Sequence, residues 1–208
     1  MKNINHTRVI LFSAAWLLLS SCGGMLSSDK PAEKTFWLNP FSPAASAESG
    51  PGQTGLTVQF SVVPGLDSDH LLILDPNSEL NHFAGARWPD YLPEFAGSLI
   101  RRSLQETGWF TKVSDGRTSG LDDCELQLEA QKFYTLTNAA GKPESVQMSM
   151  SGDYRCHGAA SQLRLDSSVR VNGADLAAIV AAHQLALDQL LGSLLTQLKH
   201  SRDAVESG

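Results

Sequence analysis

Residues 124–156 read CELQLEAQKFYTLTNAAGKPESVQMSMSGDYRC, and this stretch predicts a long β-hairpin. The residues from Asn138 to Lys142 supply a turn centred on Ala140. Folding the chain about that centre makes the even-numbered face mainly apolar on both strands, with the pairs Leu126–Tyr154, Leu128–Gly152, Ala130–Met150 and Tyr134–Val146. The hydrophobic pattern and the turn therefore favour the same register.

The same register places Cys124 opposite Cys156. A disulfide between them would agree with the pattern and the turn, so we expect one. The chain has no C-x-x-C motif and no histidine at ligand spacing from either cysteine, so no metal site is expected.

Other segments complete the outline of a fold. Alternating or short apolar runs predict strands at Leu56–Val62, Leu71–Leu74, Leu80–Ala84, Trp109–Val113 and Leu163–Val171, the second and third forming a hairpin. A helix is predicted from a cap at Asp90 to a stop at Gly108. The pattern indicates an α+β fold in which two helices pack on a mostly antiparallel sheet.

The second helix begins near residues 172–175 and carries an apolar stripe as far as Leu198. His183 lies inside that stripe. It is either a proton-sensitive switch at a partner face or a satisfied histidine between helix and sheet. The tail from residue 201 to residue 208 is polar, and we expect it to fray.

The N-terminus carries a secretory leader that ends at a cysteine. Lys2 and Arg8 precede an apolar run from Val9 to Leu19. This run is too short to span a bilayer, because a transmembrane helix needs roughly 20 apolar residues. Leu19-Ser20-Ser21-Cys22 resembles a bacterial lipobox. The resemblance implies cleavage after residue 21 and a diacylglycerol and an N-acyl chain on Cys22, which would anchor the protein stably. Asp is absent after Cys22, so we expect the periplasmic face of the outer membrane.

Residues 22–54 are rich in Ser, Gly, Ala and Pro, and we expect a lipid anchor followed by a flexible tether of roughly 30 Å root-mean-square span. Phe36-Trp37-Leu38 interrupts it as a docked strand, a binding motif or a transiently packed segment. One domain then occupies residues 55–200. Of 16 basic residues the leader removes two, which leaves 14 against 22 acidic residues and a charge of −8. Nucleic acid is therefore a poor partner.

Catalytic motifs are absent from the sequence, so no catalytic residue, metal or cofactor is expected beyond the acyl chains. The cluster Asp67-Ser68-Asp69-His70 has reactive residue types but lacks the glycine and distal glutamate of a calcium loop, so we expect a turn between strands. Arg87-Trp88-Pro89 stands just before the first helix. This pair either clamps a partner or fixes the start of the helix.

The stretch His82–Leu92 (HFAGARWPDYL), continued by Leu99 and by Gly108-Trp109-Phe110, resembles the ABC-type transport auxiliary lipoproteins. The element Pro64-Gly65-Leu66-Asp67 and the lipobox fit as well. The resemblance implies an α/β sandwich similar to the N-terminal domain of TolB. It also implies a non-enzymatic partner of an ABC transporter with an MCE-domain protein, which moves phospholipids or other hydrophobic molecules across the envelope. A relative in the paraquat-inducible system forms a ring, so a homo-oligomer is also considered.

Two further functions remain open at this stage: an assembly or pilot lipoprotein that acts as a TolB-like binding module, and an envelope hydrolase, which the missing nucleophile motif disfavours. For the transport function, the residue types enriched in binding hot spots favour Arg87, Trp88 and Tyr91 as the partner-binding set.

Overall fold

The computed structural model describes residues 33–42, 54–116 and 124–206. The described elements are, in chain order, β1 (Lys34–Thr35), β2 (Leu56–Val62), the 3-10 turn η1 (Pro64–Leu66), β3 (His70–Leu74), β4 (Leu80–Arg87), α2 (Leu92–Glu106), β5 (Val113–Ser114), β6 (Cys124–Thr137), β7 (Pro143–Cys156), β8 (Ala159–Arg170) and α3 (Leu176–Glu206). The α+β class expected from the sequence is confirmed. The predicted leader, the predicted acylation site Cys22 and, of the predicted tether, residues 23–32 and 43–53 lie outside the described residues.

The predicted hairpin forms as β6 and β7. Leu126 pairs with Tyr154, Leu128 with Gly152 and Ala130 with Met150, as the turn position predicts. The Asn138 side chain closes the turn, because its Oδ1 accepts hydrogen bonds from the amides of Ala140 and Lys142. At the open end, Cys124 and Cys156 form a disulfide. Three independent features of the sequence thus converge on one register.

Past Ala130 the predicted register is wrong by one residue. The pairing shifts between Ala130 and Lys132, so Val146 lies opposite Thr135, and Tyr134 lies opposite Gln147. Gln131 is the extra residue of this β-bulge, and its Nε2 donates to the Ser151 hydroxyl over 2.7 Å. The bulge exchanges the two faces of the strand, so the buried side chains continue as Phe133, Thr135 and Thr137.

The sheet is mixed. Its two longest ladders, β6–β7 and β7–β8, are antiparallel, as is the hairpin β3–β4. Strand β2 instead runs parallel to the first half of β6, and β3 runs parallel to its end. The chain between β2 and β6 includes α2, and such a helical crossover permits the parallel pairing.

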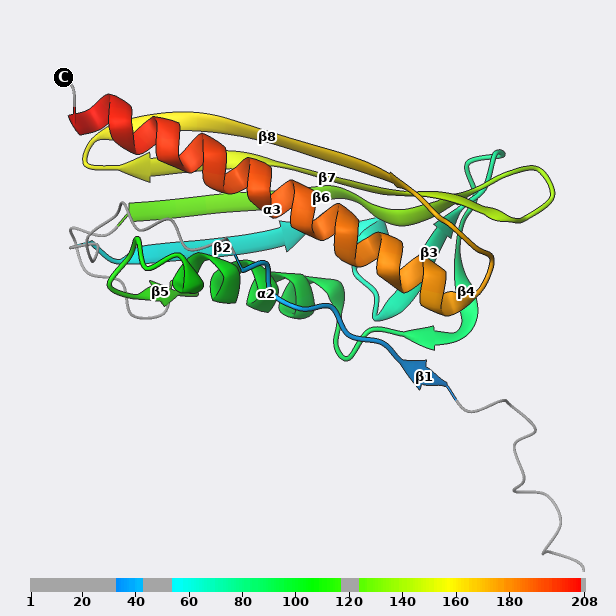
Figure 1. Cartoon of the computed structure of the whole chain (residues 1–208). Helices are drawn as coiled ribbons and strands as arrows, with labels where there is room; N and C mark the ends of the chain where they lie inside the picture. The colour runs from blue at the N-terminus through cyan, green and yellow to red at the C-terminus, as the bar shows by residue number, and fades with distance from the viewer. Residues whose placement is uncertain (1–32, 43–53, 117–123, 207–208) are drawn as a thin grey trace, which may run out of the picture. The chain divides into compact units, whose positions relative to one another are not determined.

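Both helices cover one face of this sheet (Figure 1). Helix α2 packs on β2 and β5, and α3 packs on β7 and β8. Along β8 the burial alternates residue by residue, with Leu163, Leu165 and Val169 beneath the helices. The residues between them are polar and exposed on the opposite face of the strand, among them Arg164, Asp166 and Ser168.

Helix α2 starts one residue later than predicted. Its N-cap position is Tyr91, and the Asp90 carboxylate accepts a hydrogen bond from the Tyr91 amide. The backbone turns at Gly108, which has a φ of 68° and therefore favours glycine. Of the strand expected at Trp109–Val113, only Val113 enters a strand, because β5 consists of Val113 and Ser114.

Helix α3 runs on to Glu206, so the expectation of a frayed tail is wrong for residues 201–206, and residues 207–208 lie outside the described residues. The Arg202 guanidinium lies 5.5 Å from the centre of the Trp109 ring, and Ser201 shares a hydrogen bond with Ser161. By length and composition, this helix from Leu176 to Arg202 is apolar enough to cross a membrane, but half of its most apolar window is buried in the domain. Packing against the sheet accounts for its apolar character.

Polar side chains along one side of α3 form hydrogen bonds with β8. Gln189 accepts a hydrogen bond from the Ser167 hydroxyl, and Gln197 donates to the Arg164 carbonyl. With the Ser161–Ser201 bond, these contacts recur at every one or two turns of the helix. The helix therefore shields β8, which pairs with β7 alone among the described strands. An uncovered edge of this length would invite pairing with another chain.

We predict that Gly152→Ala destabilises the domain by about 2 kcal/mol or more. A Cβ at this position would lie 1.8 Å from the Gln127 carbonyl oxygen, so the two strands would have to separate. Gly192→Ala is the control, because its nearest neighbour, Phe41 Cζ, is 3.8 Å away, and it should stabilise helix α3 by up to about 1 kcal/mol. Urea unfolding measures both. Equal stability of Gly152→Ala and wild type would show that the strands do not approach this closely.

Candidate functional site

The turn before β3 holds the start of helix α2. The Asp69 carbonyl accepts a hydrogen bond from the Trp88 amide over 2.6 Å, and the Ser68 carbonyl accepts one from the Leu92 amide over 3.1 Å. The first amide of the helix is thereby satisfied without a capping side chain. Ser68 and Asp69 directly follow the element Pro64–Asp67, so the chain just after that element holds the segment 82–92.

Trp88 is a core residue. Its side chain is 1% exposed. Its ring stacks on Phe95 of α2 at 5.4 Å and meets the rings of Phe133 on β6 and His183 on α3 edge-on, at 6.0 and 5.3 Å. Trp88 therefore joins both helices to the sheet. The expectation that its indole contacts a partner is wrong, because the ring has no surface to offer.

Arg87 makes ionic contacts within the chain. Its Nη1 lies 3.6 Å from a carboxylate oxygen of Glu33 and 3.6 Å from one of Asp69. The second carboxylate oxygen of Asp69 lies 2.8 Å from Nδ1 of His70. Arg87 is half-exposed, so each contact contributes at most about 1 kcal/mol. Its position links the N-terminal segment to the turn before β3.

Residues Glu33–Ser42, which the sequence assigned to a flexible tether, are packed on the domain. Lys34 and Thr35 pair with Ala86 and Arg87, and Leu38 is only 3% exposed. The segment is docked, but its strand is Lys34–Thr35, and the predicted island Phe36–Leu38 follows that strand as irregular backbone. The domain begins at Glu33 rather than at residue 55.

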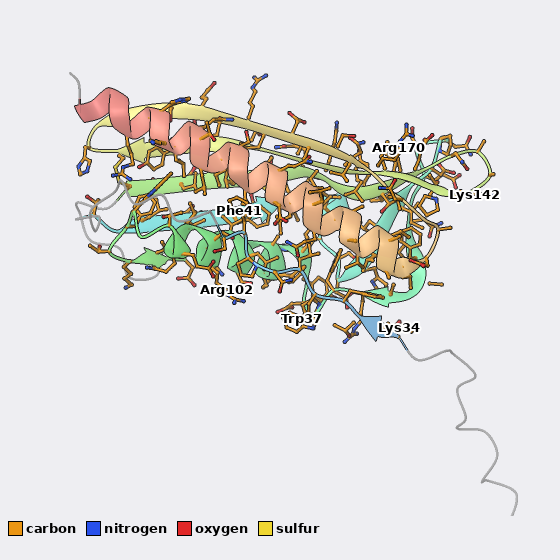
Figure 2. The ribbon with its side chains drawn as sticks, in the orientation of Figure 1. Lys34, Trp37, Phe41, Arg102, Lys142 and Arg170 are labelled. Atoms are coloured by element: carbon orange, nitrogen blue, oxygen red, sulfur yellow. A yellow bond between two sulfur atoms is a disulfide. The ribbon has the colours of Figure 1, made fainter. Side chains whose placement is uncertain are left out.

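Both helices hold this segment, which runs between them (Figure 2). Asn39 and the side-chain amide of Gln184 on α3 exchange two hydrogen bonds, of 2.7 and 3.1 Å. The Phe41 amide donates to the hydroxyl of Ser103 on α2 over 2.8 Å. Its path is fixed at three successive points along the chain, counting the β1 pairing.

Two large aromatic side chains stay exposed at the start of α2. Trp37 is 67% exposed and Tyr91 is 54% exposed, whereas Phe95, one helical turn after Tyr91, is buried. The Trp37 ring meets Phe95 edge-on at 6.5 Å, which gives the exposed ring a fixed base. We call Trp37 and Tyr91 the aromatic patch. Sequence reasoning chose Tyr91 but left Trp37 in the tether, because a short apolar island does not reveal its packing partner.

The cluster Asp67–His70 is a turn and lacks the geometry of a catalytic triad. The Ser68 hydroxyl lies 3.4 Å from Nδ1 of His70, and the Asp69 carboxylate lies 2.8 Å from the same nitrogen. A triad needs the nucleophile and the carboxylate on opposite ring nitrogens, so that one proton can move between them. Ser68 instead accepts a hydrogen bond from the His70 amide, as turn residues do.

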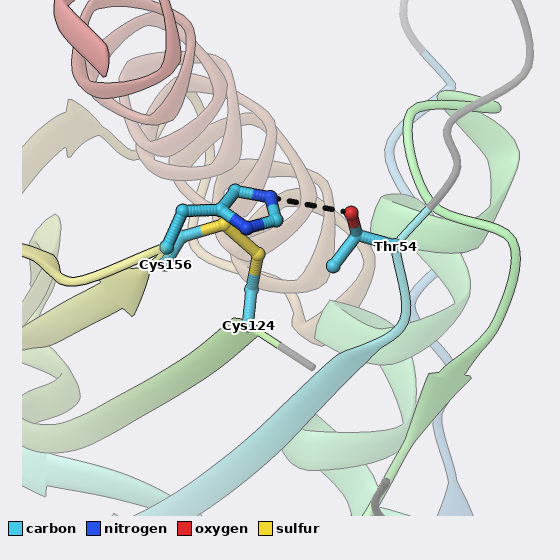
Figure 3. Close-up of a disulfide and its surroundings, with 4 residues drawn as sticks. Thr54, Cys124 and Cys156 are labelled. Carbon is cyan, nitrogen blue, oxygen red and sulfur yellow. Dashed lines mark hydrogen bonds between the residues drawn. A yellow bond between two sulfur atoms is a disulfide. The ribbon is translucent and has the colours of Figure 1, made fainter. Parts of the chain in front are cut away.

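A histidine does lie beside the disulfide, contrary to the sequence expectation. Atoms of Cys124, Cys156 and His157 that could serve as ligands lie within 4.8 Å of one another. The disulfide occupies both sulfur atoms, so no thiolate is available to a metal in this form. The His157 imidazole instead lies 3.3 Å from the Thr54 hydroxyl (Figure 3).

The uncovered face of the sheet contains an open hollow. It is lined by Gln59, Ser61, Gln127, Glu129, Ser151 and Asp153. Amide, hydroxyl and carboxylate groups are mixed there without a nucleophile and base in contact. This face offers polar hydrogen-bonding groups to a partner rather than an enclosed ligand site.

His183 is fully buried. Its Nδ1 lies 2.9 Å from the Ile179 carbonyl and so carries the proton, while Nε2 has no hydrogen-bond partner among the described residues. Burial lowers the pKa of His183 to about 4, against a smaller opposite effect of the Ile179 hydrogen bond. The neutral ring packs between Trp88 and Phe133, which favours a core histidine between helix and sheet over a switch at a partner face. Only one of its two ring nitrogens is satisfied, so the expectation of a fully satisfied histidine is met in part.

Three comparisons relate the chain to known proteins. No family model matches it, and no curated protein matches it. Among solved structures, protein XCC0632 from Xanthomonas campestris, described by the family model DUF330, has a TM-score of 0.64 at 17% identity, over 86% of this chain and 99% of that one. A crystal structure of an uncharacterized protein has a TM-score of 0.62 at 13% identity, over 81% and 99%. At these identities the likeness establishes a shared fold.

We predict that His183 makes the domain sensitive to acid. Its folded-state pKa of about 4 lies below the ordinary value of 6.5, so protons bind the unfolded chain more readily. The stabilising effect of the neutral ring is complete above pH 6.5 and is lost as the pH falls towards 4, by up to about 3 kcal/mol. Urea unfolding at pH 7 and pH 4.5 measures the loss.

His183→Asn is the matched variant, because its amide nitrogen keeps a donor near the Ile179 carbonyl without titrating. Its free energy of unfolding should fall less between the two pH values than that of the wild type. An equal fall in both proteins would assign the acid sensitivity to other groups.

Proposed function

We propose that this chain is a lipid-anchored accessory protein of an ABC/MCE-type transporter, held at the periplasmic face of the outer membrane, where phospholipids or other hydrophobic molecules cross the envelope. Three features support the proposal: the leader that ends in Leu-Ser-Ser-Cys22, the Arg87-Trp88 junction that resembles the transport auxiliary lipoproteins, and a fold shared with a DUF330 protein. The role in this proposal is positional: the anchor holds the domain at the membrane, and one face of the domain binds the transport partner.

The packing of Glu33–Ser42 on the domain shortens the chain that is left between the domain and the proposed anchor. Eleven residues, 23–33, separate Cys22 from β1, and a chain of this length spans at most about 40 Å. A tether that reached residue 54 would span up to about 110 Å. The domain is therefore kept close to its anchor, at a distance that suits the presentation of a partner site.

The partner in this proposal is the MCE-domain protein of the transporter, and we assign it to the uncovered face of the sheet. Strands β6, β7 and β8 lie side by side there with exposed polar side chains, and no described helix covers them (Figure 1). Of the junction residues expected to bind the partner, Trp88 is buried and Arg87 contacts Glu33 and Asp69. The uncovered face of the sheet therefore offers a partner more accessible side chains than the Arg87–Trp88 junction does.

We predict that Cys22→Ala releases the protein from the membrane. Loss of the thiol removes the acyl chains, and a domain with a formal charge of −8 has no affinity of its own for anionic lipid. Cell fractionation with immunoblotting should find the variant soluble in the periplasm or retained with its leader. Normal processing together with outer-membrane fractionation of Cys22→Ala would refute the anchor.

We predict that a photo-crosslinking amino acid at Gln147, on β7, captures the MCE-domain protein in intact cells. Gln147 lies on the uncovered face and bonds to Ser145 and Ser168. The same probe at Arg102 on α2, on the helix side of the domain, is the control (Figure 2). Capture of a secretin or another assembly protein from Gln147 would favour the pilot-lipoprotein alternative. Capture of the MCE protein from Arg102 alone would contradict the assignment of the sheet face.

A further inference from the structure

The aromatic patch formed by Trp37 and Tyr91 has no covering partner among the described residues. The domain keeps its other tryptophans out of water to a greater degree: Trp88 is buried, and Trp109 is partly buried beneath Arg202. The Trp37 ring rests edge-on against Phe95, so the exposed side chain has a rigid base. The Trp37 side chain is therefore available to contact a membrane or another molecule, and it does not fill the core of the domain.

We propose that this patch contacts the bilayer to which the chain is anchored, at the level of the lipid headgroups. Tryptophan and tyrosine are the residues enriched at this depth, because each combines an apolar ring with a polar group that stays in the wet layer. The inference rests on the proposed lipid anchor at Cys22.

The length of the chain outside the described domain selects the membrane as the occupant. Fourteen residues, 23–36, separate Cys22 from Trp37, and the last of them are held by β1 and by the bond from the Phe36 amide to the Arg87 carbonyl. Trp37 is thus the exposed large apolar residue that follows the anchor most closely along the described chain. A bilayer within about 40 Å of β1 is within reach of the patch if the domain turns this end towards it.

The size of the patch argues against a protein occupant. Two partly exposed aromatic rings offer a few hundred Å² at most, whereas a stable protein interface buries about 800 Å² on each partner. The charges around the patch also matter. Arg87 lies 3.6 Å from carboxylate oxygens of both Glu33 and Asp69, so its charge is compensated and would not bind anionic lipid without an anchor.

The contact between the aromatic patch and the bilayer is weak, so it forms only after the anchor has brought the domain to the bilayer. A tether of this length raises the local concentration of the patch at the surface, and a weak contact then becomes populated. The contact would fix which end of the domain faces the lipid and would leave the sheet face directed along the membrane or away from it.

Tryptophan quenching by brominated phospholipid tests the proposal. The mature protein has three tryptophans, Trp37, Trp88 and Trp109, because Trp16 leaves with the leader. The acylated protein is reconstituted into vesicles of phosphatidylethanolamine and phosphatidylglycerol (3:1), with or without bromine near the glycerol end of the acyl chains. We expect bromine to quench part of the emission, and we expect that part to be lost in Trp37→Phe and kept in Trp109→Phe.

A second preparation separates failure of this inference from failure of the proposed anchor. The Cys22 thiol of unacylated mature protein is coupled to a maleimide phospholipid, since the other two cysteines are joined in a disulfide. If natural protein does not float with vesicles, the acyl anchor is wrong, and the coupled protein still tests the patch. Vesicle-bound protein whose quenching is absent, or unchanged in Trp37→Phe, would overturn the membrane contact.

The same fluorescence measurement detects a protein occupant. If a second copy covers the patch, the emission of anchorless protein will shift to the blue as its concentration rises, and Trp37→Phe will abolish the shift. That result would overturn the proposal. A concentration-independent spectrum without vesicles, together with Trp37-dependent quenching on vesicles, is the result that the structure predicts.

Discussion

Strand β6 is paired along both of its edges, and the rest of the domain depends on that pairing. One edge carries β7 over nearly its whole length, closed by the Cys124–Cys156 bridge. The other edge accepts two parallel strands in succession, β2 along the first half and β3 near the end. Between them lies the Gln131 bulge, which turns Phe133 towards Trp88. A single strand therefore sets the positions of the sheet, of the tryptophan that joins the helices and of the junction at the start of α2.

The packed N-terminal segment connects this architecture to the envelope function that we propose. Because Glu33–Ser42 pairs with β4 and bonds to both helices, the chain leaves the domain at β1, beside the aromatic patch. A lipid on Cys22 would then control both the distance and the orientation of the domain. With the proposed anchor, this packed segment would determine which surface of the domain faces the bilayer and which surface remains for a protein partner.

Sequence reasoning reached the features that rest on local pattern and missed those that rest on distant contacts. Alternating apolar residues, a turn at Asn138–Lys142 and two cysteines were enough for the first half of the hairpin. The bulge was not predictable, because Gln131 carries no glycine or proline signal and its bond to Ser151 spans the hairpin. The parallel direction of β2 has no signature in its own residues. Trp88 looked like an interface residue because composition alone cannot distinguish a buried indole from an exposed one, whereas the contacts with Phe95, Phe133 and His183 can.

The central claim is that Glu33–Ser42 belongs to the folded domain, and amide hydrogen exchange followed by NMR tests it most directly. The amides of Phe36, Asn39 and Phe41 donate to the Arg87 carbonyl, the Gln184 side chain and the Ser103 hydroxyl. In the mature protein these three amides should exchange many times more slowly than in an unstructured peptide of the same sequence. Exchange of all three at the rate of the free peptide, while the amides of β6 and β7 stay protected, would contradict the account.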